Sequence, residues 1–174
     1  LFSKTVELDS GHLSAHIQIG NLFLSSKMPT QALEKAVLVL EKDPENVEAL
    51  LLKSSASIAL NDNATAKDIL QNLLNKGITQ QDVFLLLASA HSKDNRDDLA
   101  EDILIKGLDV NKDSSFLLFA LTNIYARNNQ FDKAITALDR LCTQNPDRHE
   151  LRISLADLYW LTGQSEKVEN TLKS

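Results

Sequence analysis

The sequence of 174 residues contains little of what catalytic and metal-binding sites require. It has a single cysteine, Cys142, so no disulfide can form within the chain. It also has no glycine-rich phosphate loop, no nucleophile motif of the form G-x-S-x-G and no closely spaced pair of cysteines. We therefore expect no enzyme active site, no cofactor and no metal ion in this chain.

Basic clusters and long apolar runs are also missing. The formal net charge is −6, and no group of lysine and arginine residues offers several contacts to phosphate, which argues against binding of nucleic acid. No apolar run approaches the roughly 18 to 20 residues of a membrane-spanning helix, so direct membrane insertion is not expected. One cysteine is compatible with the cytoplasm and with an extracytoplasmic compartment, and the compartment stays open.

What the sequence does contain is a period of 34 residues. A fixed period of this length indicates one structural unit copied along the chain, with each copy burying its apolar face against its neighbours. Three columns of residues keep the same phase: an alanine column, a mostly aromatic column and a column of small residues. They are Ala32, Ala66, Ala100, Ala134 and Val168; Phe23, Ser57, His91, Tyr125 and Tyr159; and Gly20, Ser54, Ala88, Thr122 and Ala156.

Each copy is predicted to contain two amphipathic helices. In the fourth copy, apolar residues recur at spacings of three, four and seven from Leu117 to Tyr125 and again from Phe131 to Cys142. Residues 128–130 supply a tight turn between the two helices, and Pro146 ends the second one. The column of small residues should mark where two helices cross closely.

The order of small residue, aromatic residue, turn, alanine, apolar residues and proline resembles the tetratricopeptide repeat family. The residues that carry the resemblance are Thr122, Tyr125, Ala134, Leu138, Leu141 and Pro146, and Gly20, Phe23, Ala32 and Pro44. The resemblance implies an all-α fold, an α-solenoid that winds as a right-handed superhelix of about five tandem helix–turn–helix repeats. We place a single array over 1–174, with repeats at 13–46, 47–80, 81–114, 115–148 and 149–174 and a remnant of a preceding repeat at 1–12.

The resemblance also implies a concave groove lined by the first helices of successive repeats. On these helices an apolar column, Ile17, Leu51, Leu85, Phe119 and Ile153, runs beside a polar one, Asn21, Ser55, Ser89, Asn123 and Asp157. Asn side chains in such a groove can pair with a peptide backbone. The predicted partner-binding residues are Asn21, Leu51, Ser55, Leu85, Ser89, Phe116, Phe119, Asn123, Arg127 and Asp157.

Further residues on these helices either border the predicted groove or fit a second role in the core. Leu52 and Leu86 fit core packing between helices as well as they fit the groove, whereas Glu48 and Asp82 edge the apolar patch with negative charge. Some family members clamp the C-terminal carboxylate of chaperones with lysine and arginine. The matching lysine position here is Ile17, so we do not expect a chaperone-tail adaptor.

The cysteine and three of the histidines have plainer interpretations. Cys142 lies on the apolar stripe of a helix and is predicted to be a packed core thiol. His12 and His16 have the spacing of a metal-binding pair, but no third ligand is nearby in the sequence. His91 stands in the aromatic column and is predicted to pack in the core rather than act as a base.

Two functions therefore remain. The first is a protein–protein interaction module that binds a peptide or helix of a partner as part of a larger scaffold protein. The alternative is a structural spacer or self-association segment attached to another domain, possibly a catalytic one. Val168 and Leu172 would have no following helix to cover them, which predicts weak self-association through the terminal helices. The resemblance suggests a bacterial protein, either extracytoplasmic or cytoplasmic.

Overall fold

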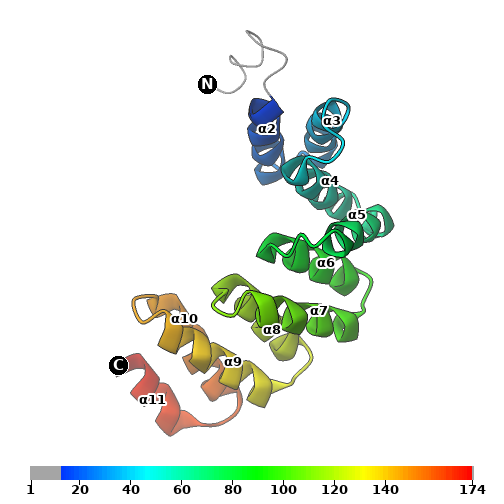
Figure 1. The fold of residues 1–174 in the computed structure, drawn as a ribbon. Coiled ribbons are helices and arrows are strands. Elements are labelled where there is room, and N and C mark those ends of the chain that lie inside the picture. The colour runs from blue at the N-terminus through cyan, green and yellow to red at the C-terminus, as the bar shows by residue number, and fades with distance from the viewer. Residues whose placement is uncertain (1–12, 174) are drawn as a thin grey trace. The chain divides into compact units, whose positions relative to one another are not determined.

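The computed structural model describes residues 13–173, and every regular element within that range is an α-helix (Figure 1). The predicted all-α helical-repeat fold is confirmed. The predictions for residues 1–12 and for His12 lie outside the described residues.

The helices alternate between a first and a second helix of each repeat. The first helices begin at residues 13, 47, 81, 115 and 149, a constant step of 34 residues. They are α2 (Leu13–Ser25), α4 (Val47–Ala59), α6 (Gln81–Lys93), α8 (Ser115–Arg127) and α10 (His149–Leu161). The second helices are α3 (Pro29–Leu40), α5 (Asn63–Asn75), α7 (Asp97–Val110), α9 (Phe131–Gln144) and α11 (Ser165–Lys173).

The turn inside each repeat contains one residue in the left-handed backbone conformation. These residues again lie 34 positions apart: Lys27, Asn61, Asn95, Asn129 and Gly163, with φ between 58° and 74°. Glycine and asparagine adopt this conformation at little cost, whereas lysine does not. The first turn is therefore the strained member of the series.

Several helix starts are fixed by side chains that accept a backbone N–H. The side-chain oxygen of Asn46 accepts the N–H of Ala49 at 3.0 Å at the start of α4. Asp62 and Ser114 cap α5 and α8 in the same way. Each cap satisfies an N–H that has no partner within its own helix, and so defines where the helix begins.

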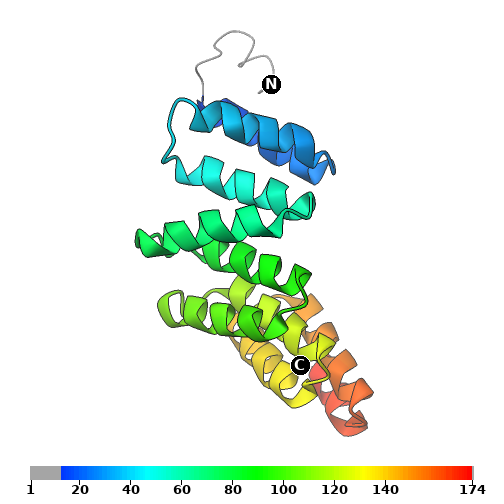
Figure 2. The same ribbon diagram turned by 90° about the vertical axis from the view of Figure 1, so that its right-hand side faces the viewer.

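Contacts divide the chain into two compact units, and the division falls inside α7 after Ala100. In the N-terminal unit, up to Ala100, helices that follow one another pack side by side, and the first helices α2, α4 and α6 also contact one another in sequence (Figures 1 and 2). In the C-terminal unit, from Glu101, α8 packs on α9, α9 on α10 and α10 on α11. The single array over residues 1–174 stays a prediction.

The small-residue column is buried, and so is the alanine column as far as Ala134, whereas Val168 is partly exposed. Ala32, Ala66 and Ala134 are fully buried. A Cβ atom on Gly20 would collide with Cδ2 of Leu52, so the Leu52 side chain of α4 fills the space that glycine leaves on α2. Leu52 itself is buried against Ala32, Ala36 and Ala56, which decides in favour of core packing for this residue.

Replacing Ala134 by leucine should therefore destabilise the fold. The added methylenes overpack a fully buried position, and we expect a loss of about 1 to 3 kcal/mol in the free energy of unfolding, measured by urea denaturation. Thr143→Leu, the same new side chain at an exposed position of α9, is the control and should change the midpoint little. Equal changes in the two variants would contradict the predicted crossing.

Relieving the strain at Lys27 should have the opposite effect. Lys27→Asn is expected to raise the free energy of unfolding by roughly 0.5 to 1 kcal/mol, because asparagine tolerates the left-handed conformation better. The reciprocal change in the next repeat, Asn61→Lys, should lower it by a similar amount. A gain from both substitutions, or from neither, would show that the backbone conformation is not the cause.

Candidate functional site

A groove opens on the first helices of the N-terminal unit. Residues of α2, α4 and α6 line a cavity of about 470 Å³. Four of the predicted partner-binding residues meet there: Asn21, Leu51, Ser55 and Leu85. The remaining lining residues are Ile17, Gln18, Glu48, Leu52, Asp82 and Leu86. We call this cavity the N-terminal groove.

The side chains of the N-terminal groove differ in how much they reach solvent. Leu51, Leu85 and Leu86 are partly exposed and present apolar surface in the groove, whereas Ile17 and Leu52 are buried beneath it. Asn21 is exposed at the edge, and no hydrogen bond among the described residues engages its side-chain amide. An apolar floor with an available amide can hold a side chain and pair with the backbone that carries it.

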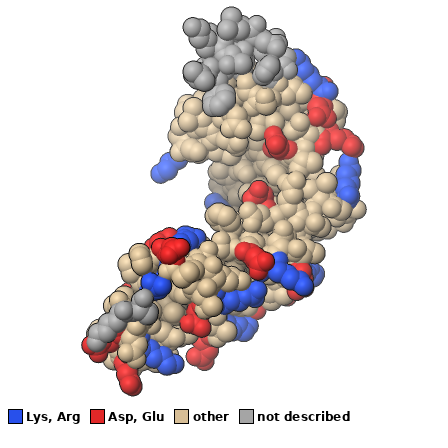
Figure 3. All heavy atoms as spheres, turned by 60° about the vertical axis from the view of Figure 1, so that its left-hand side comes forward, with Lys and Arg blue, Asp and Glu red and all other residues tan. Residues whose placement is uncertain are grey.

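The charge of the N-terminal groove is acidic. Glu48 and Asp82 line it, and none of its lining residues is lysine or arginine. In Figure 3, the upper part of the surface is largely uncharged and carries separate acidic side chains. Two carboxylates beside apolar surface favour a positively charged group at this edge, and the attraction weakens with salt.

A smaller cleft gathers predicted residues of the C-terminal unit. It lies among α8, α9 and α10, has a volume of about 180 Å³ and contains Phe119, Asn123 and Asp157. Thr122, Ala126, Leu138, Ser154 and Leu158 complete its lining. We call it the C-terminal cleft. Three predicted residues, Ser89, Phe116 and Arg127, are exposed and line neither the N-terminal groove nor the C-terminal cleft.

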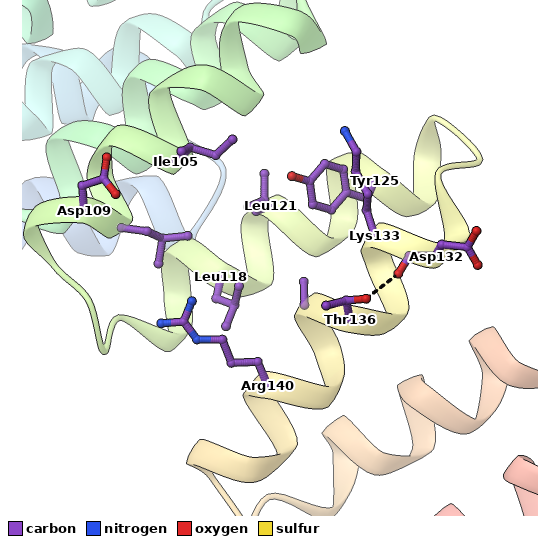
Figure 4. Close-up of a pocket in the computed structure, with 11 residues that line it drawn as sticks. Ile105, Asp109, Leu118, Leu121, Tyr125, Asp132, Lys133, Thr136 and Arg140 are labelled. Carbon is purple, nitrogen blue, oxygen red and sulfur yellow. Dashed lines mark hydrogen bonds between the residues drawn. The ribbon is translucent and has the colours of Figure 1, made fainter.

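Sequence reasoning missed a third cavity, of about 520 Å³, among α7, α8 and α9 (Figure 4). Its apolar wall includes Ile105, Leu118 and Leu121, and Arg140 extends from α9 toward α7. Arg140 donates to the backbone carbonyl of Lys112 at 3.1 Å. Ile105, an apolar residue on the second helix α7, is 40% exposed, and the 34-residue columns assigned it no role.

Tyr125 borders this third cavity beside two charged residues. The Nζ of Lys133 lies 3.0 Å from a carboxylate oxygen of Glu101 and 4.9 Å from the centre of the Tyr125 ring. Burial, together with the nearby Glu101 carboxylate, raises the pKa of Tyr125 to about 12. The phenol is therefore protonated at neutral pH.

Two further residues that the sequence analysis interpreted, Cys142 and His91, are also described by the structure. Cys142 is only partly buried, so the prediction of a packed core thiol was too strong; desolvation by burial raises its pKa and keeps it a thiol. His91 is also partly buried, and desolvation lowers its pKa. Among residues 13–173, no three His, Cys, Asp or Glu side chains are grouped closely enough to hold a metal ion.

None of the helices between residues 13 and 173 is both long enough and apolar enough to span a bilayer.

Comparison with protein families identifies part of the chain directly. Residues 115–158, which include α8, α9 and most of α10, match the model of the tetratricopeptide repeat. No curated protein matches the sequence.

Solved structures share the fold along nearly the whole chain. A thermophilic tetratricopeptide repeat protein of Thermus thermophilus superposes with a TM-score of 0.75 and 19% identity, over 91% of this chain and 87% of that one. MamA gives 0.69 and 21%, over 92% and 88%. YrrB, described as having an unusual peptide-binding site, gives 0.61 and 21%, over 99% and 89%. The family match thus covers residues 115–158, and the rest of the chain shares the fold of solved tetratricopeptide repeat proteins.

Proposed function

We propose that the chain is a protein-interaction module that binds a peptide of a partner protein in the N-terminal groove, as part of a larger scaffold. The observation that carries the proposal is the convergence of Asn21, Leu51, Ser55 and Leu85 from three consecutive first helices on one cavity. YrrB, which has the same fold, is described as a peptide-binding protein, and this agrees with a peptide as the ligand.

The lining of the groove defines the chemistry of that peptide. Leu51 and Leu85 provide contact for an aliphatic or aromatic anchor, which would gain about 25 cal/mol for each Å² of apolar surface removed from water. The amide of Asn21 can donate to a peptide carbonyl and accept from a peptide N–H. These contacts supply affinity with little dependence on the sequence of the peptide.

Sequence preference comes from the acidic edge. Glu48 and Asp82 attract a lysine or arginine placed near the apolar anchor and repel an acidic residue at the same position. The preferred ligand is therefore a short segment that combines an apolar anchor with a basic neighbour.

Fluorescence anisotropy with three labelled ten-residue peptides tests this preference. All three carry two leucines four residues apart, and the residues that flank the leucines are lysine, asparagine or glutamate. We expect the lysine peptide to bind tightest and the glutamate peptide weakest, with the difference shrinking as salt is added. Replacing both Glu48 and Asp82 by lysine should reverse the order.

The apolar floor is tested with the same peptides. Leu85→Ala should weaken binding of the lysine peptide by about tenfold or more, because truncating a central anchor typically costs about 2 kcal/mol. Val110→Ala, at an exposed apolar position outside the groove, is the matched control. Binding that is equally strong in the wild type, in Leu85→Ala and in the charge-reversed variant would contradict the proposed site.

Two neighbouring residues of α8 allow an exposed cleft residue to be compared with a core residue in the C-terminal unit. Phe119 is 44% exposed and lines the C-terminal cleft, whereas Leu118 is 4% exposed. Leu118→Ala should lower the free energy of unfolding by about 2 to 5 kcal/mol, as for other buried leucines. Phe119→Ala should leave the urea midpoint nearly unchanged. A large loss for Phe119→Ala would place this side chain in the core.

A further inference from the structure

The third cavity, among α7, α8 and α9, combines an apolar wall with the size of a ligand pocket. All of its lining residues belong to the C-terminal unit. Leu118 and Leu121 of α8 are 4% and 5% exposed and form the buried part of the wall, whereas Ile105 of α7 is 40% exposed. The volume of about 520 Å³ lies within the roughly 300 to 1,000 Å³ that is typical of pockets for small organic molecules. An apolar ligand that covers this wall would remove it from water.

Arg140 supplies a polar group beside this apolar wall. Its side chain extends from α9 toward α7 (Figure 4), and its Nη2 donates to the backbone carbonyl of Lys112 at 3.1 Å. A guanidinium has two pairs of parallel N–H groups, and Nη2 contributes one N–H to each pair. The single bond to Lys112 therefore leaves one complete pair, whose geometry matches the two oxygens of a carboxylate.

The positive charge of Arg140 has no ionic partner among the described residues. Lys133, the other cation of the cavity, pairs with Glu101 at 3.0 Å, so its charge is already offset. Asp109 and Asp132 also line the cavity, but neither forms an ion pair with Arg140, and the carboxylate of Asp132 points away from the apolar wall in Figure 4. Of the lining residues, Asp109 is therefore the one whose negative charge would oppose an anion held by Arg140.

We propose that the third cavity binds a small carboxylate with an apolar body, of the size of a medium-chain fatty acid. The carboxylate accepts from the remaining pair of N–H groups on Arg140, and the hydrocarbon lies along Ile105, Leu118 and Leu121. The guanidinium would repel a cation of the same size, and a neutral molecule would leave the N–H pair without a charged acceptor. The cavity shares no residue with the N-terminal groove, so this function goes beyond the proposed peptide binding.

Isothermal titration calorimetry of the chain with sodium octanoate tests the proposal. We expect saturable binding of one octanoate per chain, and binding of octanol that is weaker by about tenfold or more, because octanol keeps the hydrocarbon but lacks the charged acceptor. Hexanoate, octanoate and decanoate should bind more tightly in that order, by about fourfold for each methylene that the wall covers. The absence of saturable octanoate binding, or equal binding of octanoate and octanol, would overturn the proposal.

The role of Arg140 is tested by removing its N–H groups. Arg140→Met keeps an unbranched apolar side chain and should weaken octanoate binding by about tenfold or more, while octanol binding stays the same. Arg148→Met makes the same change of charge at an exposed arginine that does not line the cavity, and it should leave octanoate binding unchanged. Equal affinity of the wild type and Arg140→Met for octanoate would contradict the site.

A substitution at Asp109 should act in the opposite direction. Asp109→Asn removes the carboxylate that opposes the ligand, so octanoate should bind several times more tightly. The variant should fold normally, because Asp109 is exposed and forms no ion pair with a described residue. Asp102→Asn, at an exposed position of α7 outside the cavity, is the matched control. Weaker octanoate binding by Asp109→Asn would mean that this carboxylate attracts the ligand, and would overturn the proposal.

Two further titrations establish the source of the carboxylate and the place where it binds. Acetylated trileucine carries a carboxylate on an apolar peptide, and binding of this peptide more tightly than decanoate would assign the cavity to a protein C-terminus instead of a small molecule. Leu85→Ala alters the N-terminal groove and should leave octanoate binding unchanged. A loss of octanoate binding in Leu85→Ala would place the ligand in the N-terminal groove and contradict the proposal.

Discussion

The close crossing of helices at small side chains is the constraint on which the rest of this structure depends. Gly20 leaves space for Leu52, and Ala32, Ala66 and Ala134 are fully buried where a larger side chain would force the helices apart. Because these positions recur every 34 residues, so do the helices and their faces. The residues of the first helices that point away from the crossings then gather in grooves, as in the cavity on α2, α4 and α6.

The 34-residue repeat could be predicted from the sequence because, in a solenoid, residues that recur at a fixed spacing along the chain occupy equivalent positions in successive repeats. The helix bounds and the buried alanine column follow from it directly. The residues of the candidate site could be predicted from the sequence only in part. Leu51 and Leu52 are adjacent leucines, and only the packing of Leu52 against Gly20, Ala32 and Ala56 shows that Leu52 is the buried one. The cavity among α7, α8 and α9 was missed because Ile105, Leu118 and Arg140 share no column and meet only through packing.

The first helices of the repeated unit bury one face and expose another. In the N-terminal unit, partly exposed leucines and the amide of Asn21 form a groove with acidic side chains at its edge. We propose that this groove binds a short peptide.

The most direct test of the central claim is a nuclear magnetic resonance titration of the isotopically labelled chain with the peptide that carries leucine and lysine. If the peptide binds in the N-terminal groove, the largest amide shifts will fall on α2, α4 and α6 around Asn21, Ser55 and Leu85, the residues that converge there. Shifts confined to the cavity beside Tyr125 and Arg140, or to the groove of α10 and α11 around Trp160, would contradict binding at this site.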